Sequence, residues 1–228
     1  MLSSSPTFAP REWIEDPLFR GHHEALSALL PLTRWPTAPE MNHALGPLVE
    51  RGVGRPVTFR TQRRREELRY EASIVTALEI PTRDASPHDL LNALIWATFP
   101  RGKLALHTRF HLAEAGRTAP GRTVFQDRLA LVDEGAVVRP RAGAEGSWVV
   151  FGHAILEHRI AGVEQSRSSR AELLEFDSVH STCSDRDLDH AIALALNAWV
   201  DPPPPRRPGV AVYELFPEAF CYSMTGAP

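Results

Sequence analysis

The sequence has little of several features that would place it in a specialised class of protein. Its 28 acidic and 25 basic residues nearly balance, so the formal net charge is only −3, which argues against a general attraction to nucleic acid or to an anionic membrane. Its two cysteines, Cys183 and Cys221, lie far apart and form no CxxC pair. We therefore expect free thiols, a reducing compartment and no cysteine-type zinc motif.

Long apolar runs and targeting signals are also missing from the sequence. No stretch of about 18 apolar residues occurs, so we predict no transmembrane helix. The first residues, MLSSSPTFAPREW, contain no apolar core of a secretory signal. These absences predict a cytoplasmic protein, and 228 residues are enough to bury a sizeable core.

Lysine is the scarcest residue, since 24 of the 25 basic residues are arginine and only Lys103 is lysine. A coding bias toward arginine would explain the general preference. Lysine at this position is explained if the site requires a compact ammonium group whose pKa can be shifted, which arginine does not provide. The alternative is that Lys103 survived by chance on a solvated surface, and the residue count leaves both interpretations open.

The order of the predicted elements favours an α+β fold over a doubly wound sheet, because helices and strands do not alternate regularly. Helical periodicity precedes two strand patterns, GRPVTFRT and LRYEASIVTALEIPTR, joined by a charged hairpin tip. A second hairpin is expected at VDEGAVV, with its bend at Gly135. We predict a single compact domain over residues 1–228, helix-rich, with a small antiparallel sheet, a buried central helix and a proline-rich strap at 201–208.

The central helix is predicted from the stretch SPHDLLNALIWATFPRGK, residues 86–103. Ser86 is a typical N-cap, Pro87 suits the first helical position, and Asp89 completes a capping box. Positions 90–97 are apolar except for Asn92. A helix that is apolar on all sides is a buried helix.

Three residues with polar groups, His88, Asn92 and Trp96, are spaced four apart and therefore lie on one face of this helix. A buried amide without partners costs about 1–3 kcal/mol, so Asn92 must be paired. The helix N-terminus disfavours a cation, so we expect His88 to stay neutral and to act as a base or a metal ligand. Alternatively, Asn92 only ties the helix to a neighbouring backbone.

A second motif, FGHAILEH, places Gly152 between a strand and a helix, so that His153 stands at the helix mouth. Glu157 follows four residues later on the same face and is expected to orient His153 or to share a metal with it. The order His153, Glu157, His158 does not match the HExxH motif of zinc proteases.

A third cluster is acidic. Asp127 lies in an apolar helical segment, where we expect it to be paired with Arg122 or Lys103. Asp133 and Glu134 precede Gly135, which is typical of a turn.

Together these motifs resemble a bacterial family described as domain of unknown function 3025, whose sequences tend to contain HDxFNALxWxxFPxxK, RDxLTxFDE and FGHALxEK. The resemblance runs over residues 13–160, whereas residues 161–228 diverge. Gln126, His107 and His158 depart from the family pattern. The resemblance names no reaction, but it argues against chance survival of Asn92 and Lys103.

If the motifs converge, they form a pocket suited to general acid–base catalysis or to a divalent metal with N and O ligands. The first hypothesis is a hydrolase-like enzyme, with or without a metal, that acts on a small anionic substrate clamped by Lys103. Its catalytic residues would be His88, Asn92, Lys103 and His153. A metal would be held by His88, Asp127, His153 and Glu157.

The alternative is a non-enzymatic binding or scaffold protein whose polar cluster is a structural core network. An enzyme requires His88, His153 and Lys103 to share an open pocket. A scaffold predicts that they are separated, or sealed and fully hydrogen-bonded. A third hypothesis, nucleic-acid binding by the arginines of residues 60–69, is opposed by the overall charge. The sequence does not indicate an oligomeric state.

Overall fold

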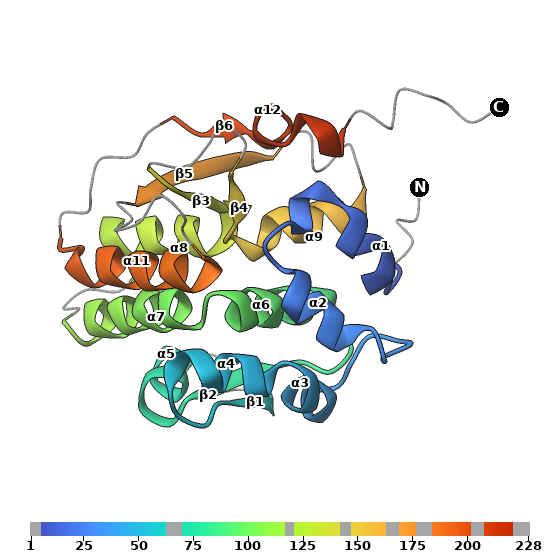
Figure 1. Ribbon diagram of the computed structural model, residues 1–228. Coiled ribbons are helices and arrows are strands. Elements are labelled where there is room, and N and C mark those ends of the chain that lie inside the picture. Colours follow the sequence, from blue (N-terminus) through green and yellow to red (C-terminus); the bar gives the residue numbers. More distant parts are fainter. Residues whose placement is uncertain are drawn as a thin grey trace.

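Two helices placed end to end, α6 (Pro87–Thr98) and α7 (Pro100–Ala115), form the middle layer of the structure (Figure 1). The structure is a computed structural model that describes residues 6–62, 70–116, 121–141, 147–162, 169–176, 184–201 and 208–220. Ser86 caps α6 by accepting a hydrogen bond from the Asp89 backbone N–H at 3.3 Å. Phe99, whose backbone is not helical, separates the two helices, and Pro100 starts the second.

The elements on one side of this layer come from the first third of the chain (Figure 1). They are α3 (Ala38–Ala44), α4 (Gly46–Val53), β1 (Thr58–Thr61), α5 (Tyr70–Ala72), a π-helical turn (Ser73–Ala77) and β2 (Glu79–Thr82). Strands β1 and β2 pair in parallel. Helix α1 (Pro10–Glu15), a 3-10 turn (Pro17–Phe19) and α2 (His23–Leu29) lie at one end of the middle layer.

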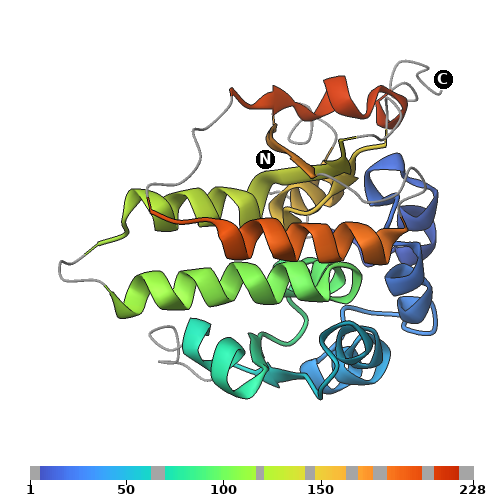
Figure 2. The ribbon, with the colours of Figure 1, turned by 60° about the vertical axis from the view of Figure 1, so that its left-hand side comes forward.

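The opposite side carries a four-stranded mixed sheet and three helices. They are α8 (Val124–Gly135), β3 (Ala136–Pro140), β4 (Val149–Val150), α9 (His153–Ala161), β5 (Arg170–Phe176), α11 (Asp185–Ala198) and β6 (Val210–Ala211), followed by α12 (Val212–Leu215) and a 3-10 turn (Pro217–Ala219). The strand order is β4-β3-β5-β6, with β3 and β5 parallel and the outer pairs antiparallel. Figure 2 shows α7, α8 and α11 lying side by side.

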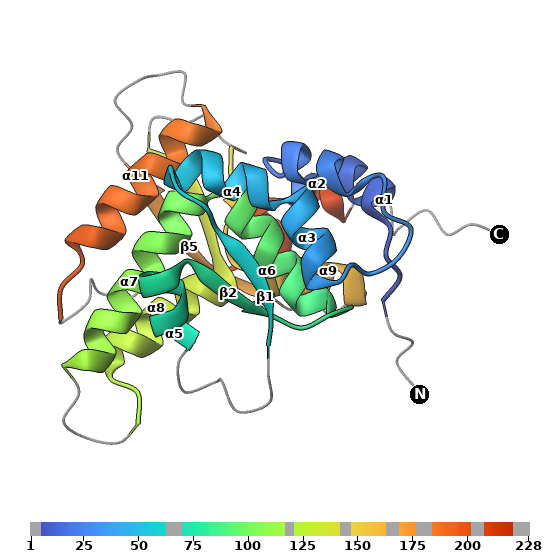
Figure 3. The same ribbon diagram turned by 90° about the horizontal axis from the view of Figure 1, so that it is seen from below.

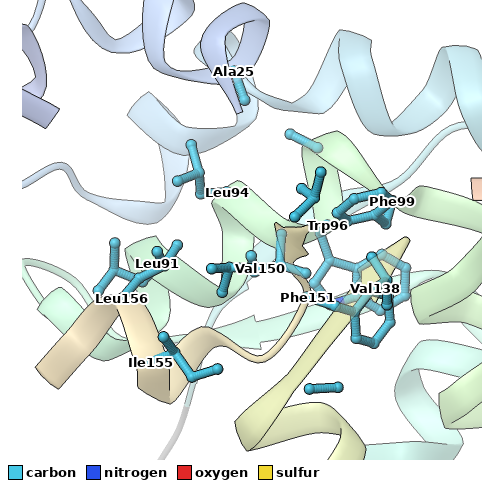
Figure 4. Close-up of a cluster of buried hydrophobic side chains, with 14 of the residues drawn as sticks. Ala25, Leu91, Leu94, Trp96, Phe99, Val138, Val150, Phe151, Ile155 and Leu156 are labelled. Carbon is cyan, nitrogen blue, oxygen red and sulfur yellow. The ribbon is translucent and has the colours of Figure 1, made fainter. Parts of the chain in front are cut away.

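The hydrophobic core is built around α6, whose residues Leu90 to Ala97 are all buried. Figure 4 shows side chains of α6 in contact with those of the β4–α9 segment, among them Leu91 beside Leu156. Buried apolar residues from Trp13 to Phe220 belong to one contiguous cluster. Within the described residues, no helix is both long and apolar enough to cross a bilayer.

The predicted α+β class, the high helix content and the buried central helix are confirmed. The antiparallel pairing expected for the first two strands is wrong, because the helical segment Tyr70–Ala77 carries the chain back so that β2 lies parallel to β1. Antiparallel pairs occur in the other sheet, between β3 and β4 and between β5 and β6. The hairpin at Gly135 is also wrong, since α8 continues to this glycine and β3 follows directly. Residues 202–207 of the predicted strap, Cys183 and Cys221 lie outside the described residues.

The open edge of β1 is covered by the side chain of Asn42 from α3. Its Oδ1 accepts a hydrogen bond from the Phe59 backbone N–H at 2.6 Å, and its Nδ2 donates to the Phe59 carbonyl at 2.6 Å. The amide therefore satisfies the two backbone groups that another strand would satisfy. Asn42→Ala is expected to lower the free energy of unfolding by about 1–3 kcal/mol in urea denaturation. The exposed neighbour His43 gives the control, since His43→Ala should change it by less than about 0.5 kcal/mol.

Candidate functional site

Polar side chains from five helices meet along the inner face of α6, and we refer to them as the polar cluster. Successive contacts between side chains, with one contact of a side chain to a backbone carbonyl, join them into one group, and segments of all three sequence motifs contribute. The members are Tyr70, Glu71, His88, Asn92, Trp96, Lys103, His107, Asp133, His153 and Glu157.

His88 and Glu157 form the solvent-exposed edge of the polar cluster. His88 Nδ1 and Glu157 Oε2 are 2.9 Å apart, and the two side chains are 42% and 38% exposed. The hydrogen bond to Glu157 raises the pKa of His88, and the same bond lowers the pKa of Glu157. The expectation that the pKa of His88 is lowered is therefore wrong, because the Glu157 carboxylate outweighs the burial that would lower it.

His153 lies directly beneath His88, with the ring centroids 4.6 Å apart in an edge-to-face arrangement. Its Nδ1 donates to the backbone carbonyl of Asp133 at 2.9 Å, which leaves Nε2 as the unprotonated nitrogen. Burial lowers the pKa of His153 to about 4. Glu157 was expected to orient His153, but α6 packs against α9 and brings His88 to this carboxylate instead.

Lys103 and Asp133 form an ion pair in the interior of the polar cluster. The lysine side chain is fully buried, so its interpretation as a chance survivor on a solvated surface is wrong. Burial alone would raise the pKa of Asp133, but the Lys103 ammonium and the neighbouring His153 and His107 hold this pKa below its ordinary value. Because Nζ is enclosed and engaged by Asp133, Lys103 does not contact solvent, where a substrate clamp would be needed.

The other end of the polar cluster contains residues that the sequence motifs did not single out. The His107 ring stacks on Trp96 with centroids 5.3 Å apart, and its Nδ1 lies 2.7 Å from Glu71 Oε2. Asn92 Nδ2 donates to the Tyr70 hydroxyl at 3.4 Å. His107 could have been found from its place four residues after Lys103 on the same helix. Tyr70 and Glu71 carried no such signal.

The polar cluster is closed to water over most of its surface, yet it is not fully hydrogen-bonded. Among the described residues, four of its buried polar atoms have no hydrogen-bond partner: Asn92 Oδ1, Trp96 Nε1, His107 Nε2 and His153 Nε2. Native cores satisfy most such atoms, so each exception points to a functional role or to bound water. A hollow of about 350 Å³ borders the cluster at Tyr70 and Glu71.

Four other predicted residues lie elsewhere. Asp127 and Glu134 are exposed on α8, so the expected burial and pairing of Asp127 is wrong. Arg122 is exposed and lines the hollow. Asp89 does not complete a capping box, because its carboxylate accepts hydrogen bonds from the Arg83 backbone N–H at 2.7 Å and from the Arg83 guanidinium at 2.8 and 3.0 Å.

The predicted metal ligands are therefore only partly assembled. His88, His153 and Glu157 lie together, whereas Asp127 faces solvent on another helix. Over the part of the chain that the structure describes, no three His, Cys, Asp or Glu side chains are arranged to hold a metal ion. Of the arginines proposed for nucleic acid, Arg60 pairs with Glu79 at 2.8 Å, and positions 63–69 lie outside the described residues.

Comparison with protein families agrees with the resemblance seen in the motifs. Residues 57–144 match the model of a family described as Protein of unknown function (DUF3025). This range contains the α6 motif and the Asp133 motif, whereas the motif of Gly152 and His153 lies beyond it. No curated protein and no solved structure shows a significant match to this chain.

Proposed function

We propose that this chain, a match to the DUF3025 family over residues 57–144, is a hydrolase-like enzyme in which His88 activates a water molecule. The observation that carries the proposal is the His88–Glu157 dyad. The Nδ1 atom of His88 is held by the Glu157 carboxylate. The side chain is half-exposed, so we expect its Nε2 atom to be accessible to water. A histidine oriented in this way by a carboxylate is the acid–base element of many hydrolytic sites.

The environment of the dyad supports this role. Glu157 raises the pKa of His88 above its ordinary value of 6.5, and a general base works best when its pKa is near the working pH. Burial keeps the adjacent His153 neutral, so its ring adds no positive charge beside His88. The Arg83 guanidinium lowers the pKa of His88, but Glu157 outweighs it. Since no Ser or Cys side chain is bonded to the dyad in the described residues, water is the nucleophile that fits the site.

Within this proposal the buried residues position the dyad rather than contact the substrate. His153 supports the His88 ring from below, and its own orientation is set by the Asp133 carbonyl. Lys103 and Asp133 fix the end of α8 that presents this carbonyl. The substrate-clamping role first expected for Lys103 is not part of the proposal.

The experiment is a screen of chromogenic esters, amides and phosphate esters with the wild-type protein, His88→Gln, Glu157→Gln and the exposed control His43→Gln. We expect His88→Gln to lower kcat/KM by about 10²–10⁴-fold and His43→Gln to leave it unchanged. Activity should rise with pH as His88 loses its proton. Glu157→Gln removes the group that raises this pKa, so the rise should move to lower pH. Turnover that survives in a folded His88→Gln variant would exclude the proposed role.

The scaffold hypothesis is the second candidate, and the sealing of Lys103 and His153 favours it. It requires no turnover with any substrate of the screen. It also requires that replacing His88, at the exposed edge, leaves both stability and ligand binding unaltered. The four unpartnered buried atoms argue against it, because a network kept only for stability gains from being fully hydrogen-bonded.

A further inference from the structure

A second cavity, of about 120 Å³, lies at the junction of α6 and α7, away from the polar cluster. Residues of α2, α4 and α11 complete its wall, and Figure 3 shows α4 beside α6 and α7. Three arginines from three different helices line this cavity: Arg51 of α4, Arg101 of α7 and Arg186 of α11. No residue of the polar cluster takes part.

The two acidic residues of this cavity are already engaged. Glu24 forms an ion pair with Arg51 at 2.6 Å. The Asp189 carboxylate accepts hydrogen bonds from the backbone N–H groups of Gly102 at 2.8 Å and Arg101 at 3.2 Å, so it caps the first turn of α7.

Two arginine charges at the cavity are not held in a close ion pair, although the Asp189 carboxylate attracts Arg101 at longer range. The Arg101 guanidinium donates through Nε to the Gly52 carbonyl at 2.9 Å, which does not neutralise it. Within the described residues, neither Arg101 nor Arg186 forms an ion pair. Since Glu24 compensates Arg51 alone and Asp189 is turned toward the backbone of α7, the cavity favours an anion.

The remaining wall of the cavity is mostly apolar. It is formed by Ala25, Leu48, Ala97 and Pro100, together with Gly21, Gly52 and Thr98. A cavity lined by both cationic groups and small apolar side chains suits a ligand with an anionic head and a short carbon part. Guanidinium groups match the tetrahedral oxygens of phosphate through paired N–H donors.

We propose that this cavity binds a small phosphomonoester, with its phosphate between Arg101 and Arg186 and its carbon part against Ala97 and Pro100. This site is independent of the proposed hydrolytic dyad, so either can fail without the other. Arg186 is the better residue to test, because it is exposed and no described residue depends on its side chain, whereas Arg101 also binds the end of α4.

The test is calorimetric titration of the full chain with inorganic phosphate, glycerol 3-phosphate and acetate. Phosphate and glycerol 3-phosphate should bind more weakly as sodium chloride is added. Arg186→Gln should weaken both by about tenfold, as the loss of a charge-assisted hydrogen bond predicts. Arg11→Gln, an exposed arginine of α1 that does not line the cavity, should bind like the wild type.

Three outcomes would overturn the proposal. They are no binding of either phosphate compound, equal affinity in the wild type and Arg186→Gln, and acetate binding as tight as that of glycerol 3-phosphate. The last would identify the ligand as a carboxylate. Circular dichroism of both variants shows whether each is folded. Ala97→Leu provides a second test, because its larger side chain should reduce binding of glycerol 3-phosphate while all three arginines are retained.

Discussion

Gly152→Ala is expected to destabilise the protein by about 3 kcal/mol or more. A Cβ atom at this position would lie 2.4 Å from the Gly135 nitrogen and 2.5 Å from both the Ala136 nitrogen and the Glu134 carbonyl carbon. All three are backbone atoms, which cannot rotate away as the end of a side chain can. The β4–α9 turn would have to separate from the α8–β3 junction, and its hydrogen bond to the Ala136 carbonyl at 2.8 Å would be weakened.

Urea denaturation measures this effect, with Gly46→Ala as the matched control. Gly46 starts α4 and would present its Cβ to open space, so its replacement should change the free energy of unfolding by no more than about 1 kcal/mol, in the stabilising direction. Equal stabilities of the two variants would show that the turn at Gly152 is not tightly packed. The same turn sets the position of His153, so Gly152→Ala should also abolish any activity that depends on His88.

Lys103→Met is the second substitution with a large expected effect, a loss of about 3–5 kcal/mol near neutral pH. It removes the ammonium from a buried ion pair and leaves the Asp133 carboxylate without its partner. Methionine has a similar length and no charge, so the change removes the charge with little change in volume. Lys103→Met with Asp133→Asn is the matched double variant. It should recover part of the loss, because no uncompensated charge remains.

The pH dependence of Lys103→Met distinguishes a lost charge from lost packing. In the wild type the pKa of Asp133 is below its ordinary value of 3.8, so its stabilising contribution is complete above that pH and disappears as the pH falls through the folded-state value. Without Lys103, burial is the larger influence and raises this pKa. Lys103→Met should then gain stability as the pH is lowered from 7.5 through this raised pKa toward 3.8, until other groups titrate. A Lys103→Met variant that gains no stability anywhere over this pH range would contradict the ion-pair interpretation.

The sequence by itself determined the local features of the site. Helical periodicity placed His88, Asn92 and Trp96 on one face of α6, and the apolar residues between them required burial. The scarcity of lysine drew attention to Lys103, and Gly152 marked the sharp turn before His153. These features depend on residues at most a few positions apart, so the pattern of the chain is sufficient to predict them.

Only the tertiary structure decided which of these groups are partners. His88 and Glu157 are 69 residues apart, and Lys103 and Asp133 are 30 apart. Which carboxylate reaches which cation depends on how α6, α7, α8 and α9 pack, and periodicity carries no information about that packing. For the same reason the sequence wrongly predicted a lowered pKa for His88, which is raised, and a buried Asp127, which is exposed. The sequence indicates the electrostatic effect of one helix end or the polarity of one segment. The charge state and burial of a side chain also depend on its neighbours from other segments.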